Sequence, residues 1–191
     1  MNKDQQQRNN NHEFILNNQS FLNWSSLNDS IMGGSSQAEC RIKPNGLLLD
    51  GNLVEEDGGF VSCRSSLFNP PLNLSEYSGL QVEVDGEGRT LKFAIYCKAW
   101  MLSFSDIFAS GLHWAAEIRT LSYGTTTLNI PFSDFQPSIQ AKQFSIPFGI
   151  DKASITQFQI LHSKFGLSGS LNQEFRPGKI NILLRSISGF H

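Results

Sequence analysis

The sequence predicts a single all-β domain, built as a β-sandwich or jelly roll with few or no helices. Two observations carry this prediction. Short apolar runs recur along the chain at a spacing of roughly 8–12 residues, as sandwich folds require. Clusters of Gly, Pro, Asn or Ser bound most of these runs. The length of 191 residues also fits one domain better than two.

The clearest predicted strand is Gly79–Asp85, GLQVEVD, in which apolar and polar residues alternate. This period of two places one face on a core and the other in water. Residues 91–96 repeat the alternation, with Lys92 and Tyr96 on the solvent side. Because the turn sequence Gly86-Glu87-Gly88 separates the two runs, they predict a β-hairpin.

The remaining elements follow from the same pattern. Further strands are predicted at residues 38–43, 47–54, 60–64, 115–121, 125–130, 155–162 and 179–187. A short helix or turn is predicted only at residues 18–27 and 132–143, and Pro137 would cut the second. Residues 1–12 are polar and low in complexity, which predicts a disordered tail before a single domain at residues 13–191.

Composition and charge disfavour several classes of function. A formal net charge of −2 and the lack of a basic stripe disfavour nucleic acid as a partner. No apolar stretch approaches the roughly 20 residues of a membrane span, and residues 1–12 lack the apolar run of a signal peptide. Cys40, Cys63 and Cys97 are odd in number and far apart, which favours reduced thiols in a cytosol-like compartment. A cytoplasmic protein is therefore expected.

Motifs for metal or catalytic chemistry are missing, so neither a metal, a cofactor nor enzymatic activity is predicted. The histidines are scattered, and no nucleophile elbow or phosphate-binding glycine loop occurs. The acidic stretch at 55–57 lacks the pattern of a calcium loop. One enzymatic alternative stays open, in which Asp29, Arg64 and His113 meet only in space. Arg64 is also a candidate to pair with a carboxylate near the first glycine loop.

The most unusual string is WSSLNDSIMGGSS at residues 24–36. Its Gly33-Gly34 pair permits positive φ and close backbone approach, and Asn28 and Asp29 can close a loop through side-chain hydrogen bonds. Such a loop either presents Met32 to a partner or locks the first strand onto the sandwich, and both interpretations stay open.

A second candidate surface lies in the least regular segment, residues 98–124, which is unusually apolar for a loop. Trp100, Phe104 and Trp114 are its candidate anchors for a partner protein. Exposed rings of this kind also stack on sugars, and core packing is the structural alternative for them.

The first string resembles the opening of the complex I intermediate-associated protein 30 family, which carries a Trp, then Asn-Asp, then Met-Gly-Gly-X-Ser. Later stretches match the family in the same order, so that the resemblance covers about residues 21–190. The matching structural residues are Trp24, Gly58, Gly59, Phe60, Arg64, Phe132, Phe135 and Pro137, and the candidate partner-binding residues within the first motif are Asn28, Asp29, Met32, Gly33 and Gly34.

The resemblance implies a galactose-binding-like jelly roll and a non-enzymatic role. The implied function is that of a chaperone-like assembly factor, which binds subunits or intermediates of a respiratory or photosynthetic membrane complex of the NADH dehydrogenase type. A peripheral position at an inner or thylakoid membrane is then the alternative to a purely cytoplasmic one. A carbohydrate-binding β-sandwich module is the competing function, because the implied fold often binds sugars.

Overall fold

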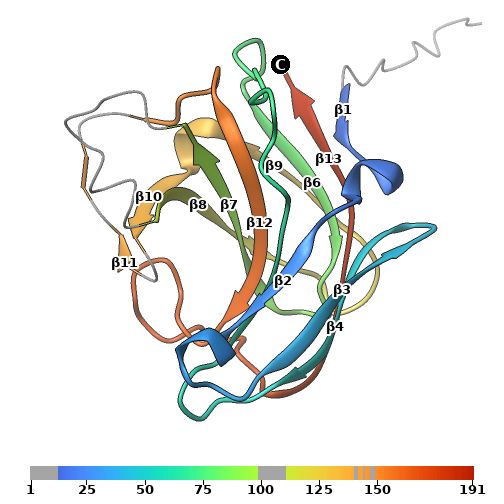
Figure 1. The fold of residues 1–191 in the computed structure, drawn as a ribbon, viewed down its shortest axis with the longest axis vertical. Helices are drawn as coiled ribbons and strands as arrows, with labels where there is room; N and C mark the ends of the chain where they lie inside the picture. Colours follow the sequence, from blue (N-terminus) through green and yellow to red (C-terminus); the bar gives the residue numbers. More distant parts are fainter. Residues whose placement is uncertain (1–12, 99–110, 140–141, 144, 147–148) are drawn as a thin grey trace, which may run out of the picture.

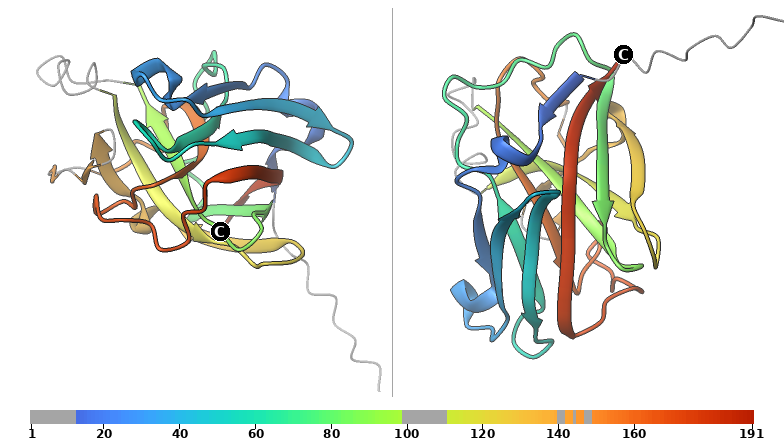
Figure 2. Two further views of the ribbon diagram at one scale, coloured as in Figure 1. Left: turned by 90° about the horizontal axis from the view of Figure 1, so that it is seen from below. Right: turned by 90° about the vertical axis from the view of Figure 1, so that its right-hand side faces the viewer.

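The computed structural model describes residues 13–98, 111–139, 142–143, 145–146 and 149–191, and the statements below concern these residues (Figure 1). They form two antiparallel sheets that pack face to face, as Figure 2 shows from two further sides. Sheet A has the order β3 (Gln37–Lys43), β4 (Gly46–Leu53), β13 (Gly178–Phe190), β6 (Gly79–Asp85) and β9 (Thr126–Pro131), and β1 (Glu13–Leu16) also pairs with β13. Sheet B has the order β11 (Lys142–Gln143), β10 (Gln136–Ile139), β8 (Leu112–Arg119), β7 (Thr90–Cys97), β12 (Ile155–Ser163), β5 (Phe60–Arg64) and β2 (Ser25–Asn28).

Strands that follow one another in the sequence are often not neighbours in space. β12 lies between β7 and β5, and β13 lies between β4 and β6, so the chain crosses repeatedly from one sheet to the other. This is the connectivity of a jelly-roll sandwich, and it confirms the predicted fold class. The described part of the chain contains only 3-10 turns, namely η1 (Asn18–Phe21), η2 (Asp29–Met32) and η4 (Phe132–Asp134), and no helix long and apolar enough to span a bilayer.

The core lies between the two sheets and is filled largely by alternate residues of the central strands. On β6 the apolar residues of the alternating run are all buried. They meet the buried rings of Phe93 and Phe158, whose centroids lie 5.5 Å apart. Trp24 is buried beside the sheets and packs edge-on against Phe21.

The predicted hairpin is wrong. β6 and β7 have the predicted alternation, but β6 pairs with β13 and β9 while β7 pairs with β8 and β12. Both edges of each strand are therefore already occupied, and the turn between them connects the two sheets. Glu87 and Gly88 adopt positive φ there, which turns the chain from one layer into the other.

The two segments predicted as a short helix or turn are confirmed in their first part, where each forms a 3-10 turn, and wrong in their later part, which is strand. Residues 18–27 form η1 and the start of β2, because the backbone of β2 pairs with β5 from Ser25 opposite Arg64 to Asn28 opposite Val61. Residues 132–143 form η4 and then β10 and β11 at the far edge of sheet B. Pairing with a neighbouring strand outweighs the weak local preference in the later part of each segment.

The expectation of three reduced thiols is wrong for two of them. Cys40 on β3 and Cys63 on β5 form a disulfide with a Cα–Cα distance of 5.9 Å. The bond joins sheet A to sheet B, since the sandwich places these strands opposite each other although the cysteines are 23 residues apart. Cys97 is free and buried, and burial raises its pKa to about 12.

Candidate functional site

One buried carboxylate organises the loop between β2 and β3. Asp29 is fully buried at the start of η2. Its Oδ1 accepts a hydrogen bond from the Ser36 amide at 2.9 Å, and its Oδ2 accepts from the Ser36 hydroxyl at 2.6 Å. The amides of Gly59 and Phe60 donate to the same Oδ2 at 2.6 and 3.2 Å. Asp29 thereby ties the loop to the start of β5, and we call this group of residues the Asp29 hub.

Burial and hydrogen bonding shift the pKa of this carboxyl group in opposite directions. Burial alone raises the pKa of Asp29, because it disfavours the charged form. The hydrogen bonds from Ser36, Gly59 and Phe60 outweigh burial and hold the pKa below its usual range. Asp29 is therefore ionised at neutral pH, and N–H and O–H dipoles stabilise its negative charge. Within the described ranges no cation forms an ion pair with it.

The glycines of both motifs make room for the hub. A Cβ on Gly34 would lie 2.5 Å from Cγ of Asp29, and a Cβ on Gly58 would lie 2.5 Å from its Oδ2. Gly33 closes η2 in the left-handed conformation with φ of 93°. The two glycine motifs that the sequence singled out are thus parts of one structural unit.

The loop that the hub holds presents an apolar pair to solvent. Ile31 is 65% exposed and Met32 is 72% exposed, although Asp29 just before them is fully buried. Asn28, half-buried at the end of β2, donates from Nδ2 to the carbonyl of Ala38 on β3 at 2.9 Å. The loop is therefore fastened on both sides of the exposed pair.

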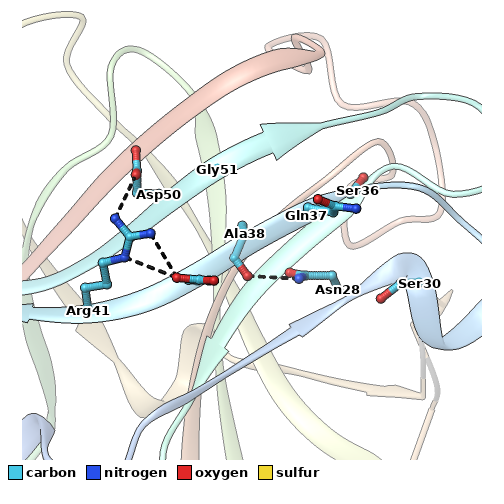
Figure 3. Close-up of a pocket in the computed structure, with 9 residues that line it drawn as sticks. Asn28, Ser30, Ser36, Gln37, Ala38, Arg41, Asp50 and Gly51 are labelled. Atoms are coloured by element: carbon cyan, nitrogen blue, oxygen red, sulfur yellow. Dashed lines mark hydrogen bonds and ion pairs between the residues drawn. The ribbon is translucent and has the colours of Figure 1, made fainter.

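A shallow polar hollow of about 470 Å³ lies beside this loop (Figure 3). Figure 3 shows Asn28 reaching from β2 to the backbone of Ala38 and Arg41 bridging the acidic groups. Arg41 contacts Glu39 at 2.9 Å and Asp50 at 3.6 Å. The hollow is lined by Asn28, Ser30, Ser36, Gln37, Ala38, Glu39, Arg41, Asp50 and Gly51.

The structure separates the other predicted partner residues. Trp114 is 2% exposed and packs in the core, so the expectation that it is a surface anchor is wrong. Its position on β8, in an apolar row that faces the other sheet, explains the burial. Trp100 and Phe104 lie outside the described residues.

Arg64 does not pair with the carboxylate of the first loop. Oδ1 of Asp29 accepts from Ser36 and its Oδ2 accepts at the start of β5, whereas Arg64 ends that strand. Its Nη2 donates instead to the Tyr96 hydroxyl and to Oε1 of Gln159, each at 3.2 Å. Asp29 is thus not brought together with Arg64 and His113, and the enzymatic alternative built on those three residues fails.

A polar layer that the sequence did not predict covers the outer face of sheet B. Lys92, His113 and Gln159 are 6%, 8% and 5% exposed, although alternation places them opposite the core. Together with the half-buried Arg64 and Tyr96 they come from four neighbouring strands, and we call these five residues the Arg64 cluster. Alternation marked Lys92 and Tyr96 as solvent-facing, and no local signal predicted that this second face is buried.

The comparisons with known proteins agree on the fold and give a family. The sequence model described as Complex I intermediate-associated protein 30 matches residues 12–184. A search of curated proteins gave no match.

Solved structures with the same fold include a carbohydrate-binding module and parts of agarases. The family 11 carbohydrate-binding module of the cellulosomal cellulase Lic26A-Cel5E of Clostridium thermocellum has a TM-score of 0.63 at 17% identity, covering 94% of this chain and 95% of that one. The same module in complex with a β-1,3-1,4-mixed-linked tetrasaccharide gives 0.63 at 18% identity, with coverage of 94% and 95%. The agarase AgWH50C gives 0.51 at 8% identity, covering 87% of this chain and 25% of its own.

Proposed function

Because the chain belongs to the complex I intermediate-associated protein 30 family, we propose that it is a non-enzymatic, chaperone-like assembly factor. Its clients are protein subunits or intermediates of an NADH dehydrogenase-like membrane complex. Binding of this kind needs a contact surface and no covalent step, and the protein meets the membrane peripherally, through its client.

The observation that carries the proposal is the exposed pair Ile31-Met32 on a locked turn. Both side chains are more than half exposed, while the Asp29 hub fixes the backbone that bears them. A contact that is already ordered before binding loses little conformational entropy when the client arrives. Methionine adds a flexible, polarisable side chain that adapts to different apolar surfaces.

The surroundings of the pair suit a protein partner. The polar hollow lies next to η2, with Arg41, Glu39 and Asp50 along it. Protein interfaces commonly have an apolar centre and a polar rim that stays in contact with water. Ile31 and Met32 supply the centre in this proposal, and the hollow supplies part of the rim.

Affinity purification from gently solubilised cells of the protein's own source tests the role. The tagged wild-type protein should recover subunits of one membrane complex above an untagged control. A variant with Ile31→Ser and Met32→Ser should recover them at least roughly tenfold less, as for the loss of central contacts in an interface. Equal recovery by this variant and the wild type would overturn the placement of the surface.

A matched control comes from another exposed apolar pair. Leu121 and Tyr123 are 57% and 92% exposed in the turn that follows β8. The variant with Leu121→Ser and Tyr123→Ser should capture the client as the wild type does. A loss in this control as large as in the loop variant would mean that surface hydrophobicity in general, and not the locked turn, governs capture.

The competing function, carbohydrate binding, has the support of the fold alone, since the modules are 17% and 18% identical to this chain. Gel electrophoresis through a mixed-linked β-glucan matrix separates the two functions. The assembly role predicts no retardation, and retardation that the free glucan reverses would favour the module.

A further inference from the structure

The Arg64 cluster is a buried polar layer that neither the core nor the Asp29 hub requires. Its members stand on β5, β7, β8 and β12, which are adjacent in sheet B. The rings of Tyr96 and His113 lie 5.2 Å apart, and the guanidinium of Arg64 lies 5.2 Å from the centre of the Tyr96 ring. Burying polar side chains this deeply costs free energy unless they are fully hydrogen-bonded or bind a ligand.

A chain of hydrogen bonds that begins in the backbone of β2 holds Arg64 in place. The Ser62 hydroxyl donates to the carbonyl of Leu27 at 2.7 Å, and Nε2 of Gln159 donates to that hydroxyl at 2.9 Å. Oε1 of Gln159 then accepts from the Tyr96 hydroxyl at 2.7 Å and from Nη2 of Arg64 at 3.2 Å. The guanidinium is thereby fixed before any ligand arrives, as in preorganised binding sites.

The fixed guanidinium has a hydrogen-bond donor that makes no hydrogen bond to the described residues. Nε of Arg64 is buried and has no hydrogen-bond partner in the part of the chain that the structure describes. Across the described residues Arg64 forms no ion pair with a carboxylate, and its hydrogen-bond partners, Tyr96 and Gln159, are neutral. A buried donor without an acceptor is unfavourable, and a bound group is one of the few explanations for such a donor in a native protein.

The charges around Arg64 favour a negative ligand. Burial lowers the pKa of Lys92 to about 8, against the opposing effect of Glu117. Burial also lowers the pKa of His113, and the positive charges of Lys92 and Arg64 add to this shift. The Gly111 carbonyl accepts a hydrogen bond from Nδ1 of His113 at 2.9 Å, so this nitrogen carries a proton. The positive charges of Lys92 and Arg64 thus both lower the pKa of His113. Glu117, the carboxylate that opposes the pKa shift of Lys92, is exposed.

We propose that the Arg64 cluster is a binding site for a carboxylate group, which Arg64 receives through its unused N–H groups. The planar guanidinium matches a carboxylate in shape and in charge, and a neutral hydroxyl group would satisfy the donor without balancing the charge. The carboxylate belongs either to an acidic side chain of a protein client or to a small free acid, and both present the same oxyanion. The site lies on the other sheet from the polar hollow at β3, so it goes beyond the assembly role and does not depend on it.

Titration of the purified, ¹⁵N-labelled protein by NMR tests the site. The probe is sodium glutarate, compared with sodium chloride at equal ionic strength, and the readout is the Nε–H resonance of Arg64. Glutarate should shift this resonance saturably, and the chloride series should not. A response to glutarate that equals the response to chloride would overturn the proposal.

Variants and further probes sharpen the test. Arg64→Lys keeps the charge but loses the planar fork, so the shifts that glutarate causes in the Tyr96 ring should need at least roughly tenfold more glutarate. Arg185→Lys, in an ion pair with Asp85 on sheet A, is the matched control and should behave as the wild type. If Arg64→Lys does not fold, the wild-type titration alone decides.

Two capped tripeptides, Ala-Glu-Ala and Ala-Gln-Ala, then separate the two sources of the carboxylate. Shifts caused by the Glu peptide and not by the Gln peptide would support a client side chain. A response to glutarate without a response to either peptide would support a small free acid. If cellotetraose shifts the same resonances and glutarate does not, the ligand of the site is a neutral sugar and the proposal is refuted.

Discussion

The amide nitrogen of Gly59 donates to Oδ2 of Asp29 across 2.6 Å, although 30 residues separate them in the sequence. This bond joins the two glycine motifs into one unit at the start of β5. The loop motif therefore has two parts with different roles. Its Asp, Ser and Gly residues hold the structure together, and its Ile and Met residues face solvent.

Replacement of Asp29 by Asn should destabilise the fold by about 3 kcal/mol, because the amide keeps only one acceptor oxygen for the donors of Ser36, Gly59 and Phe60. The free energy of unfolding from urea titration measures this. Asp134→Asn, at an exposed carboxylate bonded to Ser133, is the control and should cost little. A cost at Asp29 no larger than at Asp134 would mean that the carboxylate is not the organising group.

The pH dependence gives an independent check on the same carboxylate. The folded-state pKa of Asp29 is lowered, so its contribution is complete above the unfolded pKa of about 4 and disappears as pH falls through the folded value. The difference in stability between wild type and Asp29→Asn should therefore shrink in acid. A difference that stays constant from neutral pH to well below that value would contradict an ionised hub.

Alanine at position 34 should destabilise the protein by about 2 kcal/mol or more, because its Cβ would lie 2.5 Å from Cγ of Asp29. Among the described residues nothing lies within 4 Å of a Cβ added at Gly149, so Gly149→Ala serves as the matched control. Thermal unfolding of the two variants compares them directly. Similar midpoints would show that the loop shifts freely to accept the methyl group.

Loss of the bond between Cys40 and Cys63 should cost about 3 kcal/mol, as expected when a covalent loop of this length is opened in the unfolded chain. The paired variant Cys40→Ser, Cys63→Ser measures the cost by urea unfolding. Alkylation of the unfolded wild type before and after reduction, followed by mass spectrometry, should show one reactive thiol and then three. Three reactive thiols before reduction would contradict the disulfide.

Mild acid should weaken the fold through His162. This residue is fully buried, with Nδ1 against the Thr90 carbonyl at 2.9 Å and Nε2 against Nη1 of Arg89 at 3.2 Å. Burial lowers its pKa from 6.5 to about 4, so below pH 6.5 the unfolded chain takes up a proton that the folded chain does not. Stability should fall by about 3 kcal/mol between pH 6.5 and 4.

The variant His162→Gln checks this assignment, because it removes the titrating group and retains polar atoms. Its stability should depend less on pH over the same interval. A profile as steep as that of the wild type would assign the acid sensitivity to other groups.

The local sequence pattern was sufficient to predict most of the strands. The alternation in Gly79–Asp85 and the run Phe60–Arg64 predicted β6 and β5 with the same bounds that the structure has. The class of fold follows from such runs and their spacing, because each strand must bury one face.

Partners that meet only in three dimensions were not predictable. β6 and β7 look like a hairpin in sequence, yet each finds both of its partners elsewhere. Cys40 and Cys63 meet because the two sheets face each other, and Trp114 is buried because β8 lies inside sheet B. Long-range packing determines the strand partners, the disulfide and the burial of Trp114. A short stretch of neighbouring residues carries no information about that packing.

Photocrosslinking from position 32 tests the assembly role most directly. A photoreactive amino acid replaces Met32 in one variant and the exposed Tyr123 in another, both expressed in cells of the protein's own source. Crosslinks from position 32 to a subunit of an NADH dehydrogenase-like complex, with none from position 123, are the predicted result. Equal crosslinking from both positions, or none from position 32 while the same subunit co-purifies, would contradict the role of the locked turn in holding the client.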